Sequence, residues 1–165
     1  MAVLLLGLDV VVAWMVIQGA YVYLGMIWHG LAGESLAPGA IEAHGRQFLA
    51  LRRIQIATWV VAATVCLAWL RRARQTARAL GDPEAAAGRR ERRTAPLLAG
   101  LILAAALAHG LAASMAADRL RPLDLGGPMQ LLVLAALLEI AAAVLAILLV
   151  RWTTARLEDR RRTLT

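Results

Sequence analysis

One pair of ionisable residues in this sequence could do chemistry inside a membrane. Glu139 lies near the middle of the apolar stretch LLVLAALLEIAAAVLAILLVRW, which runs from Leu131 to Trp152. A bare carboxylate in hydrocarbon costs at least about 2.5 kcal/mol, so this acid must be protonated, paired or in contact with water. His109, in the preceding apolar stretch, is predicted to lie at a similar depth. The two residues together are typical of a proton relay or a ligand-binding pair.

A packing role is the simpler interpretation of the same residues. Gln18, near the middle of the first apolar stretch, is expected to complete a hydrogen-bonded cluster with Glu139 and His109. Such a cluster would fix how the helices pack, with each interhelical hydrogen bond worth about 0.6 kcal/mol. We favour packing over proton handling here, because a proton path needs continuous polar residues and the inner halves of these stretches contain almost none.

The remaining residue types predict no further chemistry. His29, His44 and His109 are expected at unequal depths, which argues against axial ligation of haem and leaves b-type haem as the least favoured alternative. The three histidines have no cysteine or paired-carboxylate spacing beside them, so neither a metal site nor another cofactor is predicted. The sequence shows no nucleophile constellation and no phosphate-binding loop. We therefore expect no enzymatic activity.

Four apolar stretches must position these side chains. Hydrophobic residues make up 61% of the 165 residues, and the mean hydropathy is +0.65, as in multi-pass membrane proteins. A helix needs roughly 20 residues to cross about 30 Å of hydrocarbon. We expect a single all-α domain, residues 1–165, folded as an antiparallel bundle of four transmembrane helices. The predicted spans are residues 10–31, 54–70, 96–116 and 129–150, with Thr94 capping the third helix just before Pro96.

The distribution of arginine predicts the orientation of the bundle. All 18 basic residues are arginine, and the formal net charge is +7. The loop of residues 71–94 is strongly basic, and so is the tail that follows Val150. Basic loops stay in the cytoplasm, so both termini are expected there. The abundance of alanine and the absence of lysine indicate a GC-rich bacterial genome, and hence a bacterial inner membrane.

These features predict two kinds of partner. Nucleic acid is not expected, because the sequence has no basic domain in which aromatic residues alternate with arginines. Anionic lipid headgroups are expected beside the cytoplasmic arginines, namely Arg71, Arg72, Arg74, Arg89 and Arg90. Small residues recur every four positions along the third span, at Gly100, Ala104, Ala108, Ala112 and Ala116. This smooth face is predicted to pack on the alanine-rich face of the fourth helix, or else on another protein.

One segment resembles a known family. In AWLRRARQTARALG, residues 68–81, Trp69, the Arg72-Ala73-Arg74 core and the closing Leu80-Gly81 are similar to the segment that follows a membrane helix in the bacterial family called domain of unknown function 4328. Thr76 stands where that family usually has asparagine. The last helix and basic tail, residues 142–161, are also similar. The resemblance implies a multi-helix membrane protein of unassigned activity.

Taken together, the sequence predicts a small non-catalytic membrane protein, acting as an accessory subunit or scaffold of a larger inner-membrane complex. Its partners would be the bilayer and other membrane-protein subunits. The alternative is a protein that handles protons or a small molecule through Glu139 and His109.

Overall fold

The chain folds into four long helices. A computed structural model describes residues 2–33, 39–79, 89–117 and 126–163. Within these residues the helices are α1 (Ala2–Leu31), α2 (Ala40–Ala79), α3 (Arg89–Ala117) and α4 (Gly126–Thr163). Each helix contains a segment that is long and apolar enough to cross a membrane. This confirms the prediction of an all-α chain with four potential membrane spans.

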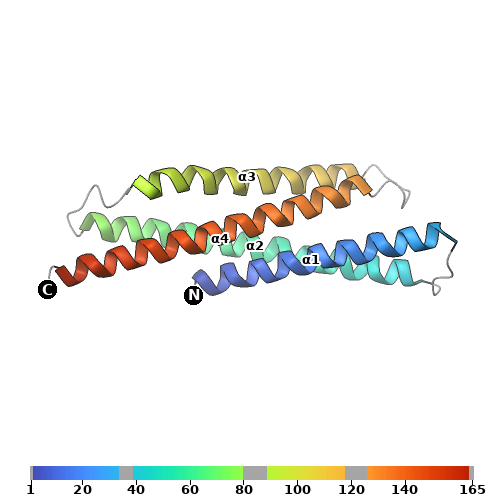
Figure 1. Cartoon of the computed structure of the whole chain (residues 1–165), viewed down its shortest axis with the longest axis horizontal. Helices are drawn as coiled ribbons and strands as arrows, with labels where there is room; N and C mark the ends of the chain where they lie inside the picture. Colours follow the sequence, from blue (N-terminus) through green and yellow to red (C-terminus); the bar gives the residue numbers. More distant parts are fainter. Residues whose placement is uncertain (1, 34–38, 80–88, 118–125, 164–165) are drawn as a thin grey trace.

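The helices extend well beyond the predicted spans. The 40 residues of α2 would measure about 60 Å and the 38 residues of α4 about 57 Å, against about 30 Å of hydrocarbon. Residues 40–53, which precede the predicted second span, belong to α2. At the left of Figure 1, α2 and α4 reach past the first turn of α1, so arginine-bearing turns project from one end of the bundle.

The predicted start of the third helix was wrong. Helix α3 begins at Arg89, so Thr94 does not cap it and Pro96 lies inside it. Arginine and glutamate are good helix formers, and the run Arg89–Arg93 therefore continues the helix toward the preceding loop. The apolar pattern indicates where the helix becomes hydrophobic enough to enter a membrane. That position lies after the residue at which the helix begins.

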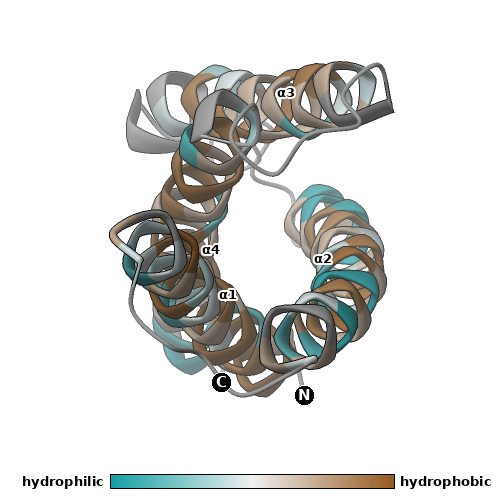
Figure 2. Ribbon diagram, turned by 90° about the vertical axis from the view of Figure 1, so that its right-hand side faces the viewer, coloured by the Kyte–Doolittle hydropathy of each residue, from teal (hydrophilic) through white to brown (hydrophobic). Residues whose placement is uncertain are grey.

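The helices form a ring that is open on one side. Helix α3 packs on α4, α4 packs on α1, and α1 packs on α2. Figure 2, viewed along the bundle, shows this order and the separation of α3 from α2. In Figure 1 each successive helix carries the chain from one end of the long axis to the other. Within the described residues, α2 and α3 do not form a packed pair.

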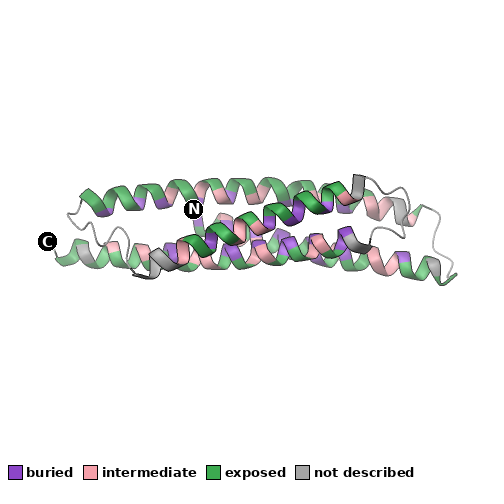
Figure 3. Cartoon of the chain, turned by 90° about the horizontal axis from the view of Figure 1, so that it is seen from above, coloured by how far each residue is buried: buried purple, intermediate pink, exposed green. Residues whose placement is uncertain are grey.

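Small residues allow the helices to approach closely in the core. Alanines from several helices are almost fully buried, among them Ala13, Ala20, Ala62, Ala105, Ala112, Ala135 and Ala136. The buried residues form three apolar clusters, and the largest of these surrounds Ala62, Cys66 and Ala143. Figure 3 shows the buried positions facing the interior along every helix.

The outer surface is apolar. Large hydrophobic side chains are exposed on all four helices, for example Trp14, Val60, Leu107 and Leu137. A soluble monomer rarely exposes contiguous apolar patches of this kind, whereas a lipid-facing surface requires them. The exposed apolar side chains therefore fit helices that lie in a bilayer.

The small-residue face of α3 is only partly used in packing. Ala108 and Ala112 are buried, Ala104 is partly buried, and Gly100 is exposed. A Cβ atom added to Gly100 would meet no other atom within 4 Å. Ala112 belongs to the same cluster as Met129 and Leu132 of α4. Contact through this face is therefore concentrated toward its C-terminal half, and the side chain of Ala116 lies outside the described residues.

Candidate functional site

Each helix contributes one polar side chain to the interior of the bundle. Among the described residues the buried polar side chains are Asp9 of α1, Gln55 of α2, His109 of α3 and Glu139 of α4. All four are nine-tenths or more buried, and Gln55 and Glu139 are the most enclosed, at 0% and 1% exposed. We call Gln55, His109 and Glu139 the polar cluster, because hydrogen bonds join them.

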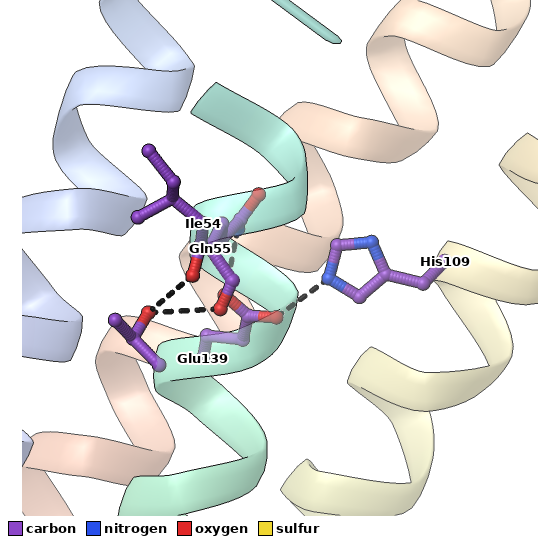
Figure 4. Close-up of polar contacts among 5 residues, drawn as sticks. Ile54, Gln55, His109 and Glu139 are labelled. Atoms are coloured by element: carbon purple, nitrogen blue, oxygen red, sulfur yellow. Dashed lines mark hydrogen bonds and ion pairs between the residues drawn. The ribbon is translucent and has the colours of Figure 1, made fainter. Parts of the chain in front are cut away.

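Glu139 is the centre of the polar cluster. His109 Nε2 lies 2.5 Å from Glu139 Oε1, and Gln55 Nε2 donates a hydrogen bond of 2.7 Å to Glu139 Oε2. Figure 4 shows His109 and Gln55 approaching the carboxyl group from different helices. The contact with His109 requires a proton on one of its two atoms, so either the imidazole Nε2–H donates to a carboxylate oxygen or a protonated carboxyl group donates to a bare Nε2.

Local structure on α2 supports this arrangement. Thr58 Oγ1 lies 3.0 and 2.9 Å from the carbonyl oxygens of Ile54 and Gln55, to which it can donate within its own helix. The ring of Trp59 lies 6.4 Å from the His109 ring, measured between centroids, at a tilt of 53°. The histidine is therefore held between a carboxyl group and an indole.

A small cavity adjoins the cluster. Its volume is about 30 Å³, and Asp9 and Glu139 both line it together with apolar residues of α2, α3 and α4. A cavity needs at least about 10–15 Å³ to hold a water molecule, so this one has room for water. Asp9 Oδ1, Gln55 Oε1 and His109 Nδ1 are buried and have no hydrogen-bond partner among the described residues. Polar atoms of this kind are usually satisfied by bound water or used in function.

The structure brings together two of the three residues predicted for the cluster. Glu139 and His109 are in contact, whereas Gln18 is exposed on α1 and takes no part. Gln55 occupies the place expected for Gln18. Asp9, which was not among the predicted residues, is 2% exposed and shares a cavity with Glu139.

Sequence reasoning missed Gln55 for an identifiable reason. Gln55 is the second residue of the predicted span 54–70 and follows Arg53 by two positions, so the sequence predicted it at the edge of the membrane. The signal that could have found it is the spacing of the buried face of α2. The buried residues of this face are spaced alternately by seven and four residues, as on one face of a packed helix. They are Gln55, Ala62, Cys66, Ala73 and Ala77.

The other predicted residues lie away from the polar cluster. Arg71, Arg72 and Arg74 are exposed near the end of α2, and the side chains of Arg89 and Arg90 lie outside the described residues. His44 Nδ1 lies 3.1 Å from the carbonyl oxygen of Ala40, one turn earlier on α2. Among the residues described, no three His, Cys, Asp or Glu side chains are placed to hold a metal ion.

Comparison with known proteins adds no relative from which a function could be transferred. No protein family, curated protein or solved structure matches the chain. The resemblance of residues 68–81 to the family called domain of unknown function 4328 therefore stays a prediction. The functional argument rests on the polar cluster and its surroundings.

Proposed function

We propose that this chain is a non-enzymatic, multi-pass protein of the bacterial inner membrane that binds a proton at Glu139 and His109. The observation that carries the proposal is the 2.5 Å contact between His109 Nε2 and Glu139 Oε1 in the interior of the bundle. Ionisable side chains in the membrane interior are costly and are usually found where protons, ions or ligands are handled.

Two further features favour proton binding over packing alone. Hydrogen bonds between uncharged side chains would suffice to fix the register of the helices, yet Asp9, His109 and Glu139 can all ionise. Asp9 and Glu139 also line the same small cavity, which places a second ionisable side chain beside the proposed proton site. At least one proton must lie between the imidazole and carboxyl groups for this contact to form, and gain or loss of a proton there would change the charge inside the membrane.

The proposal includes an orientation. We place both termini in the cytoplasm, with four antiparallel crossings, because arginine accumulates at one end of the bundle. Arg71, Arg72, Arg74 and Arg78 lie near the end of α2, and Arg151, Arg156, Arg161 and Arg162 lie near the end of α4. Cytoplasmic segments next to a membrane span carry such an excess of arginine.

Infrared spectroscopy of the purified protein in lipid discs tests the proton site. Difference spectra between acidic and alkaline buffer report protonated carboxyl groups by their carbonyl stretch, and slow exchange in heavy water identifies a buried group. An Asp9→Asn background removes the signal of the neighbouring acid. In this background we expect a slowly exchanging, pH-dependent band that Glu139→Gln abolishes.

Glu158→Gln is the matched control, because Glu158 is exposed on the same helix. It should leave the slowly exchanging band unchanged. Glutamine at position 139 keeps the shape of the side chain and can still accept the hydrogen bond from Gln55, so loss of the band would not reflect loss of the fold. A band that persists in Glu139→Gln, or a carboxyl group that never changes with pH, would overturn the proposal.

A second candidate function is that of an accessory subunit in a larger membrane complex, without a bound cofactor. It is favoured by the one-sided packing of α3, which contacts α4 and exposes Leu103, Leu107 and Leu111 on another side. Purification in mild detergent should then recover partner subunits at a fixed ratio, and Leu107→Asn should release them. A monodisperse monomer would count against this candidate, and an absorption spectrum with a haem band would contradict the absence of a cofactor.

A further inference from the structure

A groove separates α2 from α3 on the open side of the bundle. Its volume is about 810 Å³, within the range of about 300–1,000 Å³ typical of small-molecule sites. Residues of α2 and α3 form its two walls, and Leu149 of α4 contributes to its lining. The groove shares Leu67, Leu98 and Ile102 with the cavity beside Glu139, so the two spaces adjoin.

The lining of the groove changes character along its length. Arg71, Arg74 and Arg78 line one end, at spacings of three and four residues that place them on the same face of α2. Toward the membrane interior the lining residues are apolar, including Leu98, Ile102 and Ala106. None of the described residues that line the groove is acidic. The groove is therefore cationic at one end and apolar at the other.

We propose that this groove binds one anionic phospholipid. Arginine binds phosphate oxygens through paired N–H donors, so Arg71, Arg74 and Arg78 would hold the headgroup. An acyl chain would lie along the apolar lining between α2 and α3. This assignment goes beyond the general attraction of basic loops to a membrane surface, because it names one groove and one set of arginines.

Charge and shape favour a lipid over a helix of a partner protein. An apolar helix in this groove would complement only its apolar part, whereas an anionic amphiphile complements both parts of the lining. Arg72 provides an internal comparison. It lies on the same turn of α2 and is exposed, but it does not line the groove.

Native mass spectrometry of the full-length protein tests the proposal. The delipidated protein would be titrated with phosphatidylglycerol or phosphatidylcholine carrying the same acyl chains. We expect one tightly bound phosphatidylglycerol. Replacing the three groove arginines together by glutamine should weaken its binding by about fivefold for each residue. The control variant replaces Arg72, Arg151 and Arg156, which are also exposed but lie outside the groove. It should bind the lipid as the unaltered protein does.

A second variant tests the apolar part. Ala106→Phe would fill the groove from the side of α3 with the arginines intact, and it should reduce occupancy by phosphatidylglycerol. Inorganic phosphate should not displace the lipid. The proposal is overturned if phosphatidylcholine binds equally well, if the control arginines matter as much, if phosphate alone competes, or if a co-purified polypeptide occupies the groove instead.

Discussion

Both carboxyl oxygens of Glu139 have partners on other helices, Gln55 at 2.7 Å and His109 at 2.5 Å. Removing the acid would leave these two side chains buried with an unsatisfied polar atom. Each buried polar group that loses its partner costs about 1–3 kcal/mol. Glu139 therefore supports the fold as well as the proposed proton site, and the two roles can be separated by the choice of substitution.

Glu139→Leu and Glu139→Gln should differ in stability. Leucine offers no hydrogen bond and leaves both Gln55 and His109 without this partner, so we expect the free energy of unfolding to fall by about 2–6 kcal/mol. Glutamine can accept from Gln55 and donate to His109, and it should cost clearly less. Unfolding by denaturing detergent, followed by circular dichroism, measures both values. Equal losses for the two variants would show that the hydrogen bonds do not stabilise the bundle.

Gln55→Leu and Gln18→Leu form a second matched pair. Gln55 is fully buried and donates to Glu139 Oε2, whereas Gln18 is exposed. We expect Gln55→Leu to lower the free energy of unfolding by about 1 kcal/mol or more, because Glu139 loses a donor. Gln18→Leu should be neutral or stabilising in lipid. The same unfolding assay would contradict this assignment if Gln18→Leu proved the more damaging change.

The sequence sufficed to pair Glu139 with His109 but not to complete the cluster. Both residues lie well inside long apolar stretches, so their depths could be estimated from helix rise alone. Gln55 and Asp9 lie near charges or near the chain terminus, and their depths depend on where each helix begins. Both residues are buried by contacts between helices, which the apolar pattern of a single helix does not show.

At the scale of the elements, α3 depends on its contact with α4. Ala112 is 0% exposed and packs among residues of α4 and other helices. Its neighbour Ala113 is exposed on the same helix. Close packing through small residues is what holds membrane helices together, because lipid provides no hydrophobic driving force between them.

Ala112→Leu should therefore destabilise the bundle, whereas Ala113→Leu should not. Extra methyl groups in a packed interface cost about 1–3 kcal/mol, and the same side chain facing lipid costs little. Detergent unfolding of the two variants, together with the thermal stability of each in lipid discs, measures the difference. A similar effect at both positions would place the contact surface of α3 elsewhere.

The helix ends were the least predictable elements. The sequence indicated four helices by their apolar content, and the structure has them. It did not indicate that α3 would start at Arg89 or that α4 would reach Thr163. Charged residues such as arginine and glutamate are favourable in helices, so a helix continues past the membrane boundary until a turn residue stops it.

For the whole molecule, the central claim is that the four helices cross a membrane with the polar cluster between its two faces. The arginine-rich ends of α2 and α4 would then be cytoplasmic, and the connection between α1 and α2 would be external. Three exposed positions report on these ends, namely Ala32 after α1, Thr76 in α2 and Thr154 in α4. The sequence predicted this orientation from charge, and labelling can test it.

The most direct test is labelling of single cysteines with a membrane-impermeant maleimide in spheroplasts. Cys66 is the only native cysteine and would be replaced by alanine in the parent protein. We predict that Ala32→Cys reacts in intact spheroplasts, and that Thr76→Cys and Thr154→Cys react only after permeabilisation. Reaction of Thr76→Cys in intact spheroplasts, or a protein that leaves the membrane fraction without detergent, would contradict the account.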